Sequence, residues 1–448
     1  MGVVIQNQVW EPPPWLNLFL FSSSFVSIFG FTFFSNNANP STAFDLGSSH
    51  SLSSIFLRFQ RTFLAIYSLV SVLEGLQSVY GEVEYSYYGF TRDQMFMVVL
   101  YGFIVCTSVG TFLGFFASSM DQKKACVICC IFHLVASVLK GLAKLPLLSS
   151  ICSAIASFVF SYSFEAWMVS EIEKLGFRRD SLNEMFWLMT FWESVALIGS
   201  QVIANWLISG NIENGVVFPS AVAAYMAIAC LICIGKGWKT SVFTSVSKSH
   251  EMAFSPPILI DKRVYLLGVA QACVHFALTI FWLLWTPTIV ADGREVNMGM
   301  IYPCLLGARM LGSTAFPWMV TGPFSIRTED YVIMAFAVAG VMLFVPAFDY
   351  QEIWFLVAVF CIFHACVGFI LPSLARLRSL FVPNDHRAAM MSMYHAVASC
   401  MVLLVLGVDF YVWKLGNACI MGMAVVGLFA AGFCIYNLRK PQQDHRSL

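Results

Sequence analysis

Acidic and amide side chains stand inside long apolar stretches of this sequence, where a carboxyl group can take up a proton. Glu74, Gln77 and Gly81 follow one another at spacings of three and four residues, which places them on one face of a helix. Glu165 follows Ser161 by one helical turn. An ionisable group is costly in a membrane-length apolar segment, so it usually faces the protein interior and has a function. Glu74 and Glu165 are therefore candidates for a coupling proton. The alternatives are a structural hydrogen bond at Glu74 and an ion pair at Glu165.

A second polar pattern runs along the apolar segment 264–290. Its members recur at spacings of four, four, three and four residues, and so share one helix face: Gln271, His275, Thr279, Trp282 and Thr286. A polar stripe on an otherwise apolar helix indicates that this face lines a cavity. The imidazole of His275 titrates near neutral pH, so it is either an anion ligand when protonated or a hydrogen-bonded interior residue.

Arg309 is a cation in the middle of the apolar segment 297–320. An arginine at the centre of a membrane helix costs about 2.5–3.5 kcal/mol on the insertion scale, which a buried acid or a bound anion must offset. A guanidinium group donates in a fixed fork that suits a tetrahedral oxyanion. We expect Arg309 either to bind a small anion or to pair with Glu74 or Glu193, and Glu193 to serve mainly as a structural partner. Three further histidines stand alone in apolar segments and are interpreted as interior residues: His133, His364 and His395.

Composition identifies the solvent of these segments. The chain has 448 residues, of which 59% are hydrophobic and 11% charged, and its mean hydropathy is +0.76. A soluble protein is about 25% charged, so the lipid bilayer must be the main solvent. The formal net charge of zero gives no basic surface for nucleic acid. The sequence lacks a nucleotide-binding glycine loop, a zinc-type His/Glu pair and a nucleophile with a base. We therefore expect no enzyme, no cofactor and no metal.

Hydropathy predicts an all-α membrane protein. A spanning helix needs about 20 mostly apolar residues. Segment 15–34 has no Lys or Arg before it, unlike a signal peptide, and is expected to be an extra N-terminal transmembrane helix. Twelve more spans are predicted, at 61–82, 94–118, 124–144, 147–171, 182–208, 217–236, 264–290, 297–320, 331–348, 352–375, 388–410 and 416–437.

The cations orient these spans. If alternate loops face the cytoplasm, that side receives nineteen of the twenty-five Lys and Arg residues, the other side receives five, and Arg309 lies within a helix. Positive charge gathers on the cytoplasmic side of membrane proteins. The loop between the sixth and seventh spans and the C-terminal tail are therefore expected to be cytoplasmic.

The longest polar stretch divides the twelve spans into two sets of six. Two six-helix halves with a substrate site between them near the midplane describe the major facilitator fold. The predicted division has five parts: an N-terminal segment 1–55, an N-terminal half 56–236, a linker 237–263, a C-terminal half 264–437 and a tail 438–448.

Four short motifs resemble those of the molybdate-anion transporter family. They are Glu74-Gly-Leu-Gln77 with Tyr85-Ser-Tyr-Tyr-Gly-Phe90, Phe164-Glu-Ala-Trp-Met-Val169, Leu284-Trp-Thr-Pro287, and Val382-Pro-Asn-Asp-His-Arg387. The resemblance covers most of the chain from about residue 42, and it includes the extra N-terminal helix. It implies a secondary transporter that imports molybdate, and it favours the plasma membrane, with an internal membrane as the alternative.

The loop between the second and third spans departs from the superfamily pattern. That loop usually reads Gly-x-Leu-Ala-Asp-x-x-Gly-Arg-Lys and closes the cytoplasmic side through a charge network. Here Gly114 and Lys123 are kept, Lys124 follows, and Ser118 stands in place of the acid. These four residues are the gating candidates, and their altered pattern puts the usual gate in doubt.

Three functions remain open at this stage. The first is uptake of a small oxyanion, molybdate by resemblance, with protons as a candidate coupling ion. The second is transport of another anion or of an organic solute. The third is a membrane receptor or scaffold that keeps the fold without transport. The altered gating loop favours the third, whereas the charges inside the membrane oppose it, because a scaffold has no need of them.

Overall fold

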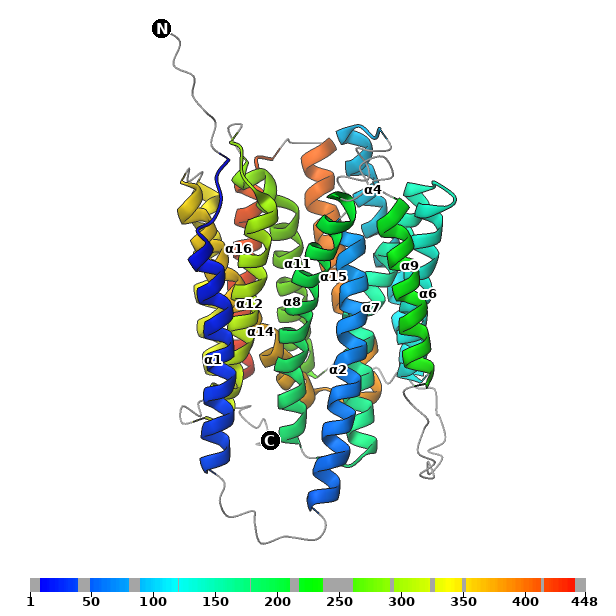
Figure 1. The fold of residues 1–448 in the computed structure, drawn as a ribbon. Coiled ribbons are helices and arrows are strands. Elements are labelled where there is room, and N and C mark those ends of the chain that lie inside the picture. Colours follow the sequence, from blue (N-terminus) through cyan, green and yellow to red (C-terminus); the bar gives the residue numbers. More distant parts are fainter. Residues whose placement is uncertain are drawn as a thin grey trace, which may run out of the picture.

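The computed structural model describes residues 9–38, 49–79, 89–119, 121–177, 179–209, 217–236, 261–290, 294–322, 327–348, 352–411 and 415–439. In these segments the regular structure is helical, apart from an isolated bridge between Trp10 and Val296. The helices stand side by side in one elongated bundle (Figure 1). The predicted all-α class is confirmed.

Thirteen α-helical rods and the short 3-10 helix η5 make up the described part of the bundle, and one rod runs unbroken from α4 through a π-helical turn, η2, into α5. The bounds are α1 Pro14–Ala38, α2 Ser49–Val79, α4 Arg92–Val105, η2 Cys106–Gly110, α5 Thr111–Ser119, α6 Gln122–Gly141, α7 Pro146–Lys174, α8 Arg179–Ser209, α9 Val217–Lys236, α11 Lys262–Ile289, α12 Met298–Val320, α13 Thr328–Phe344, η5 Pro346–Phe348, α14 Ile353–Phe381, α15 Asn384–Tyr411 and α16 Asn417–Arg439.

Each of the twelve predicted spans is a helix, and three of them extend past their predicted bounds by four or more residues at one end. The helix predicted at 61–82 begins at Ser49, that at 352–375 continues to Phe381, and that at 388–410 begins at Asn384. All three extensions lie at one end of the bundle, where α2 begins and α16 ends. We call this the lower end, because it lies at the bottom of Figure 1, and the opposite end the upper end.

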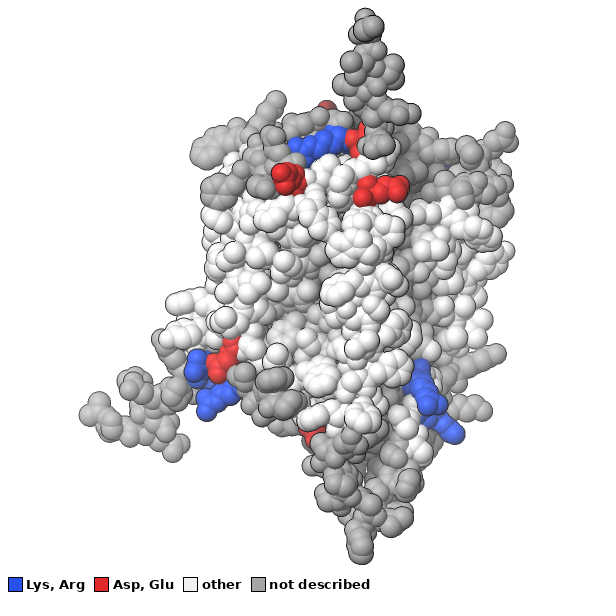
Figure 2. All heavy atoms as spheres, turned by 60° about the vertical axis from the view of Figure 1, so that its left-hand side comes forward, with Lys and Arg blue, Asp and Glu red and all other residues white. Residues whose placement is uncertain are grey.

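The outer surface has the character of a membrane protein. Ten helices in the described residues are long and apolar enough to cross a bilayer. The side turned to the viewer in Figure 2 carries its visible Lys, Arg, Asp and Glu near the two ends and none across the middle. Large apolar side chains such as Phe33 and Trp206 are 72% and 74% exposed on this surface. A belt of this kind is stable only against lipid, so the chain is a multi-pass membrane protein.

Two large apolar clusters occupy the interior. One is built mainly from α2, α6, α7, α8 and α9, and the other from α11 to α16. They correspond to the two predicted six-helix halves, and the halves meet where α8 packs against α12 and where α15 packs against α5, η2 and α7. Most of the predicted linker and tail, and residues 1–8 and 39–48, lie outside the described residues. The exact domain boundaries therefore stay predictions.

Helix α1 lies along α12, on the C-terminal half, although the chain continues from it into α2. At the upper end the backbone N–H of Trp10 donates to Glu295 O at 2.9 Å. Toward the lower end the indole N–H of Trp318 donates to the Ser27 hydroxyl at 3.1 Å. Segment 15–34 lies within α1 and is helical, as predicted. That this helix crosses the membrane stays a prediction.

Candidate functional site

A buried ion pair joins the two halves near the middle of the bundle. Arg309 of α12 donates from Nη2 to Glu193 Oε1 of α8 at 2.8 Å, and the Tyr67 hydroxyl of α2 donates to Glu193 Oε2 at 2.7 Å. We call Arg309 and Glu193 the seam pair, and Tyr67 is its hydrogen-bonded neighbour. Arg309 is 9% exposed, and its Nε has no hydrogen-bond partner among the described residues. Of the two acids considered for Arg309, the structure selects Glu193.

Close packing of α12 against α14 positions Arg309. A Cβ added to Gly368 would lie 1.9 Å from the backbone oxygen of Arg309, so only glycine allows the helices to approach this closely. One turn earlier on α14, His364 is fully buried and neither ring nitrogen has a hydrogen-bond partner among the described residues. Its ring packs against Phe281 and Trp282.

A second cluster of charges joins the halves toward the lower end, and we call it the lower gate cluster: Glu165, Gln271, Arg378 and Arg387. Glu165 of α7 accepts two hydrogen bonds from Arg378 of α14, from Nε at 2.9 Å and from Nη2 at 2.5 Å. It accepts a third from Arg387 Nη1 of α15 at 3.2 Å. Arg378 also donates from Nη1 to Gln271 of α11 at 3.2 Å. One carboxylate of the N-terminal half thus contacts two helices of the C-terminal half, and Arg378 links it to a third, α11.

The cluster is buried and extends to the lower surface. Arg387 is fully buried and Arg378 is 6% exposed. Arg387 donates from Nη2 to Asn384 Oδ1 at 3.2 Å, and the amide of Asn384 donates to Glu173 Oε2 of α7 at 2.6 Å. A bidentate guanidinium–carboxylate contact is among the strongest and most directional of polar contacts. The lower end is therefore closed by a linked set of contacts between the halves.

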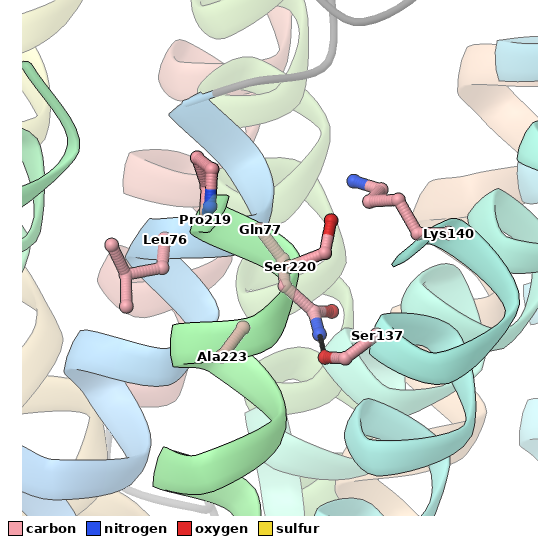
Figure 3. A pocket seen from close by; sticks show the side chains of 7 residues that line it. All are labelled: Leu76, Gln77, Ser137, Lys140, Pro219, Ser220 and Ala223. Carbon is pink, nitrogen blue, oxygen red and sulfur yellow. Dashed lines mark hydrogen bonds between the residues drawn. The ribbon is translucent and has the colours of Figure 1, made fainter. Parts of the chain in front are cut away.

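A third cluster lies within the N-terminal half, and we call it the Glu74 cluster: Glu74, Gln77, His133, Ser137, Ser153 and Ser157. Glu74 Oε2 lies 3.0 Å from His133 Nε2 of α6, and the Ser157 hydroxyl of α7 donates to Glu74 Oε1. Gln77 Oε1 lies 2.9 Å from His133 Nδ1. Figure 3 shows Gln77 reaching across to Ser137, next to a small pocket that Lys140 borders. Glu74 and Gln77 do share one face of α2, as their spacing predicted.

Of the polar stripe predicted on α11, only Gln271 belongs to one of the three clusters. Gln271 belongs to the lower gate cluster. The His275 ring lies 4.6 Å from the His395 ring of α15. Thr279 is half-buried in α11. The stripe therefore faces α15 and α14 at different levels of the bundle rather than one shared partner.

The four gating candidates stand where α5 ends and α6 begins. A Cβ added to Gly114 would lie 2.0 Å from the Ser392 hydroxyl, so this glycine allows α5 to approach α15 across the seam. Ser118 is in α5, and its side chain lies outside the described residues. Asp121, where the family pattern has glycine, caps α6 by accepting from the Lys123 backbone N–H at 3.4 Å, and Lys124 is exposed in the same turn.

Sequence reasoning missed several members of these clusters. Arg378 and Arg387 fall between the predicted spans 352–375 and 388–410, whereas α14 continues to Phe381 and α15 already begins at Asn384. The apolar run that begins at Ile353 is followed directly by Arg376 and Arg378, and basic residues are common in the last turn of a helix. This pattern could have indicated that Arg378 belongs to the helix. His133, interpreted as an ordinary interior residue, contacts Glu74 and Gln77. Tyr67 stands two helical turns before Glu74, and that spacing was the signal that it shares the interior face of α2.

Comparison with known proteins places the chain among transporters. A major facilitator family model, MFS_5, described as sugar transporters with 12 transmembrane segments, matches residues 45–373. The chain is 24% identical over 387 residues to the molybdate-anion transporter of Danio rerio, covering 78% of this chain and 80% of that protein. It is 24% identical over 404 residues to the molybdate-anion transporter of Xenopus tropicalis, covering 86% of each. The matched family consists of transporters, not enzymes.

Solved structures agree on the fold. An outward-facing bacterial homologue of the iron transporter ferroportin matches with a TM-score of 0.67 at 10% identity, covering 85% of this chain and 98% of that one. The major facilitator transporter FucP in its outward conformation matches with a TM-score of 0.65 at 12% identity, covering 86% and 100%. At such low identities these likenesses establish the major facilitator fold alone.

Proposed function

Because the chain belongs to the MFS_5 family of major facilitator transporters, we propose that it is a secondary active transporter for a small inorganic oxyanion, molybdate in the first place. The distant relatives named molybdate-anion transporters support this substrate. The observation that carries the proposal is Arg309, a buried guanidinium group near the middle of α12 with one donor left unpartnered among the described residues.

The seam pair suggests how an anion would be bound. Arg309 offers its fork to a tetrahedral oxyanion in competition with Glu193, which now accepts only one of its donors. Since Glu193 and Arg309 come from opposite halves, an anion that takes Arg309 weakens a contact that holds the halves together. Anion binding is thereby linked to movement between the halves, as alternating access requires.

The lower gate cluster supplies the other part of the cycle. It closes the lower end while Glu165 remains bonded to Arg378 and Arg387. Release of the anion at that end requires these contacts to separate. We propose that Glu165 is a gating residue rather than a proton carrier, because a carboxylate held by two guanidinium groups keeps its negative charge.

An organic solute is the second candidate. The matched family model is described as sugar transporters, and the rings of Trp282 and Tyr302 lie 5.6 Å apart on α11 and α12. Aromatic faces of this kind also suit a sugar ring. A neutral sugar, however, leaves the buried charge of Arg309 without a role beyond Glu193.

Uptake of labelled molybdate by the full chain in a transport-deficient host tests the substrate. Tungstate and sulfate are offered as competitors in one arm and neutral sugars in the other. We expect Arg309→Lys to keep its charge, lose the fork and weaken uptake affinity roughly tenfold to hundredfold, the equivalent of the ~1.5–3 kcal/mol of a charged hydrogen bond. Arg439→Gln, which breaks an exposed pair with Asp330, is the matched control. Normal affinity in Arg309→Gln would exclude Arg309 as a ligand, and competition by sugars alone would favour the second candidate.

We further propose that α1 is an extra transmembrane helix and that the lower end is cytoplasmic. Segment Pro14–Phe34 is long and apolar enough to cross a bilayer, and the charge bias of the loops supports this orientation. The plasma membrane is favoured by the family resemblance, with an internal membrane as the alternative. A cysteine replacing Ser245, in the predicted linker outside the described residues, should resist labelling from outside intact cells. Labelling from outside would reverse the orientation.

A further inference from the structure

The Glu74 cluster contains a histidine whose hydrogen-bond partners determine where its protons are. Gln77 Nε2 donates to the backbone oxygen of His133 at 3.0 Å and to the Ser137 hydroxyl at 2.8 Å. A backbone oxygen only accepts, so this end of the Gln77 side chain must be the amide nitrogen. The other end, Oε1, is then the atom that faces His133 Nδ1 at 2.9 Å.

That orientation determines the tautomer of His133. Gln77 Oε1 carries no hydrogen, and the Ser153 hydroxyl already donates to it at 2.9 Å. His133 Nδ1 must therefore be the donor in its contact with Gln77, whatever the charge of the ring. In a neutral ring the remaining nitrogen, Nε2, has a free lone pair.

The contact between His133 Nε2 and Glu74 Oε2 therefore needs one proton. His133 Nε2 and Glu74 Oε2 lie 3.0 Å apart, and neither atom has a hydrogen-bond partner among the described residues. Without a proton, a bare ring nitrogen and an ionised carboxylate oxygen would be held this close with no hydrogen to share. The contact becomes favourable with a proton on Glu74, which gives a neutral pair, or on His133, which gives an ion pair. The two residues together are thus net neutral with the proton and carry one negative charge without it.

The surroundings of the pair allow this proton to exchange by one route. The His133 side chain is fully buried, whereas that of Glu74 is 20% exposed, so Glu74 is the point of entry. Glu74 lies in the upper half of α2, five residues before its described end at Val79. Beyond Gln77, toward the upper end, a pocket of about 10 Å³ has room for about one water molecule (Figure 3).

No compensating cation contacts the pair among the described residues. The Ser157 hydroxyl of α7 donates to Glu74, and the Cys106 thiol of η2 and the Cys129 thiol of α6 are near enough to interact with its charge. Lys140 of α6 lies on the far side of Gln77, where it borders the pocket. Farther along α2, Tyr67 bonds to Glu193 of α8, whose charge Arg309 offsets. Loss of the proton therefore leaves the pair with one negative charge.

We propose that Glu74 and His133 together bind a single exchangeable proton, and that this proton is the coupling ion of the transporter. In each cycle one proton binds between Oε2 and Nε2 from the upper end and is released toward the lower end after the two halves have rearranged, and only the O–H or N–H bond to it forms and breaks. The inference rests on the proposed transport function. It gives His133 a role as the second proton-holding residue.

The test uses the purified full chain in liposomes with labelled molybdate. One assay measures uptake driven by an inward pH gradient, and the other measures exchange of internal for external molybdate at equal pH. Wild-type uptake is expected to rise with the pH gradient and to carry one proton per turnover, recorded with a trapped pH-sensitive dye. Exchange needs no net proton movement, so it reports binding and conformational change alone.

Two variants separate proton binding from structure. In His133→Asn the side-chain amide keeps the donor to Gln77 and removes Nε2, and Glu74→Gln removes the carboxylate while keeping its shape. Both should lose the stimulation by the pH gradient and the dye signal but retain exchange. Glu171→Gln, the same chemical change at a half-buried carboxylate of α7 whose partner Lys174 is exposed, should keep both. Gradient-driven proton uptake that persists in His133→Asn and Glu74→Gln would overturn the inference.

Measurements on the wild-type chain distinguish failure of the proton-pair proposal from failure of the proposed transport function. Molybdate exchange without any response to a pH gradient, or with a response to a sodium gradient instead, contradicts the proton pair and leaves the transport function standing. Absence of both exchange and uptake contradicts the proposed substrate. If another solute is carried, the same two assays with that solute decide the coupling question.

Discussion

Glu165 and Glu74 are both carboxylates on interior faces of the N-terminal half, and their partners give them different tasks. Glu165 is bonded to two arginines that belong to the other half. Glu74 accepts a hydrogen bond from a serine and lies 3.0 Å from a histidine, both of its own half. The first contact must break when the halves separate, whereas the second can gain or lose a proton while both halves stay in place. Two properties of the partner distinguish a gate from a proton site: the half of the protein it belongs to, and its charge. Burial of the carboxylate matters less.

The same substitution at the two positions should have very different effects, and Glu165→Gln should have the larger. It leaves Arg378 and Arg387 buried without a carboxylate, and removing one partner of a buried ion pair costs about 3–5 kcal/mol. We expect a marked fall in the melting temperature in detergent and greater labelling of cysteines placed at the lower end. Asp330→Asn is the control, because it breaks a partly exposed pair with Arg439, and ion pairs near the surface are typically worth about 1 kcal/mol or less. An unchanged melting temperature in Glu165→Gln would contradict the lower gate cluster as a structural lock.

Gly114→Ala should have the next largest effect, since the lower end is also closed by the approach of α5 to α15. The added methyl group overlaps the Ser392 side chain, and overpacking of this kind costs about 1–3 kcal/mol. The closed lower end should be destabilised more than a state in which the helices have separated. Cysteine labelling at the lower end measures the change. Gly407→Ala on α15 meets nothing within 4 Å and should behave like the wild type; equal labelling in the two variants would show that this approach does not hold the end closed.

Glu74→Gln should have the smallest effect on stability. The new amide can donate to His133 Nε2 and accept from Ser157, so it changes one hydrogen bond and costs about 1 kcal/mol or less. The melting temperature should stay close to that of the wild type while coupling to the pH gradient is lost. A fall as large as that of Glu165→Gln would mean that Glu74 is an obligatory ion of the fold, and the difference between the two carboxylates would disappear.

The fold was accessible from sequence because the bilayer requires long apolar helices, and each of the twelve predicted spans is a helix. Helix ends were less accessible. The last turns of α14 carry Arg376 and Arg378, so a hydropathy window ends before the helix does, although intrahelical hydrogen bonds continue to Phe381.

Partners across the bundle could not be predicted in the same way. Glu165 and Arg378 are 213 positions apart, and no periodicity connects them. For Arg309 the sequence left two acids open, because both stand on interior faces, and only packing of α12 against α8 favours Glu193. His133 could be assigned no role until Gln77 and Glu74 were found on either side of its ring.

The position of α1 has a practical consequence for spectroscopy. This helix precedes the N-terminal half in the chain but packs along α12, where Leu20 joins the apolar cluster of the C-terminal half and Trp10 is bonded to the segment ahead of α12. A fluorophore attached just before Pro14 should therefore follow the C-terminal half and not the half to which it is covalently closer. Paired with a second dye on α9, such a label would record the distance between the halves, and so the opening of the upper end, in single molecules during turnover.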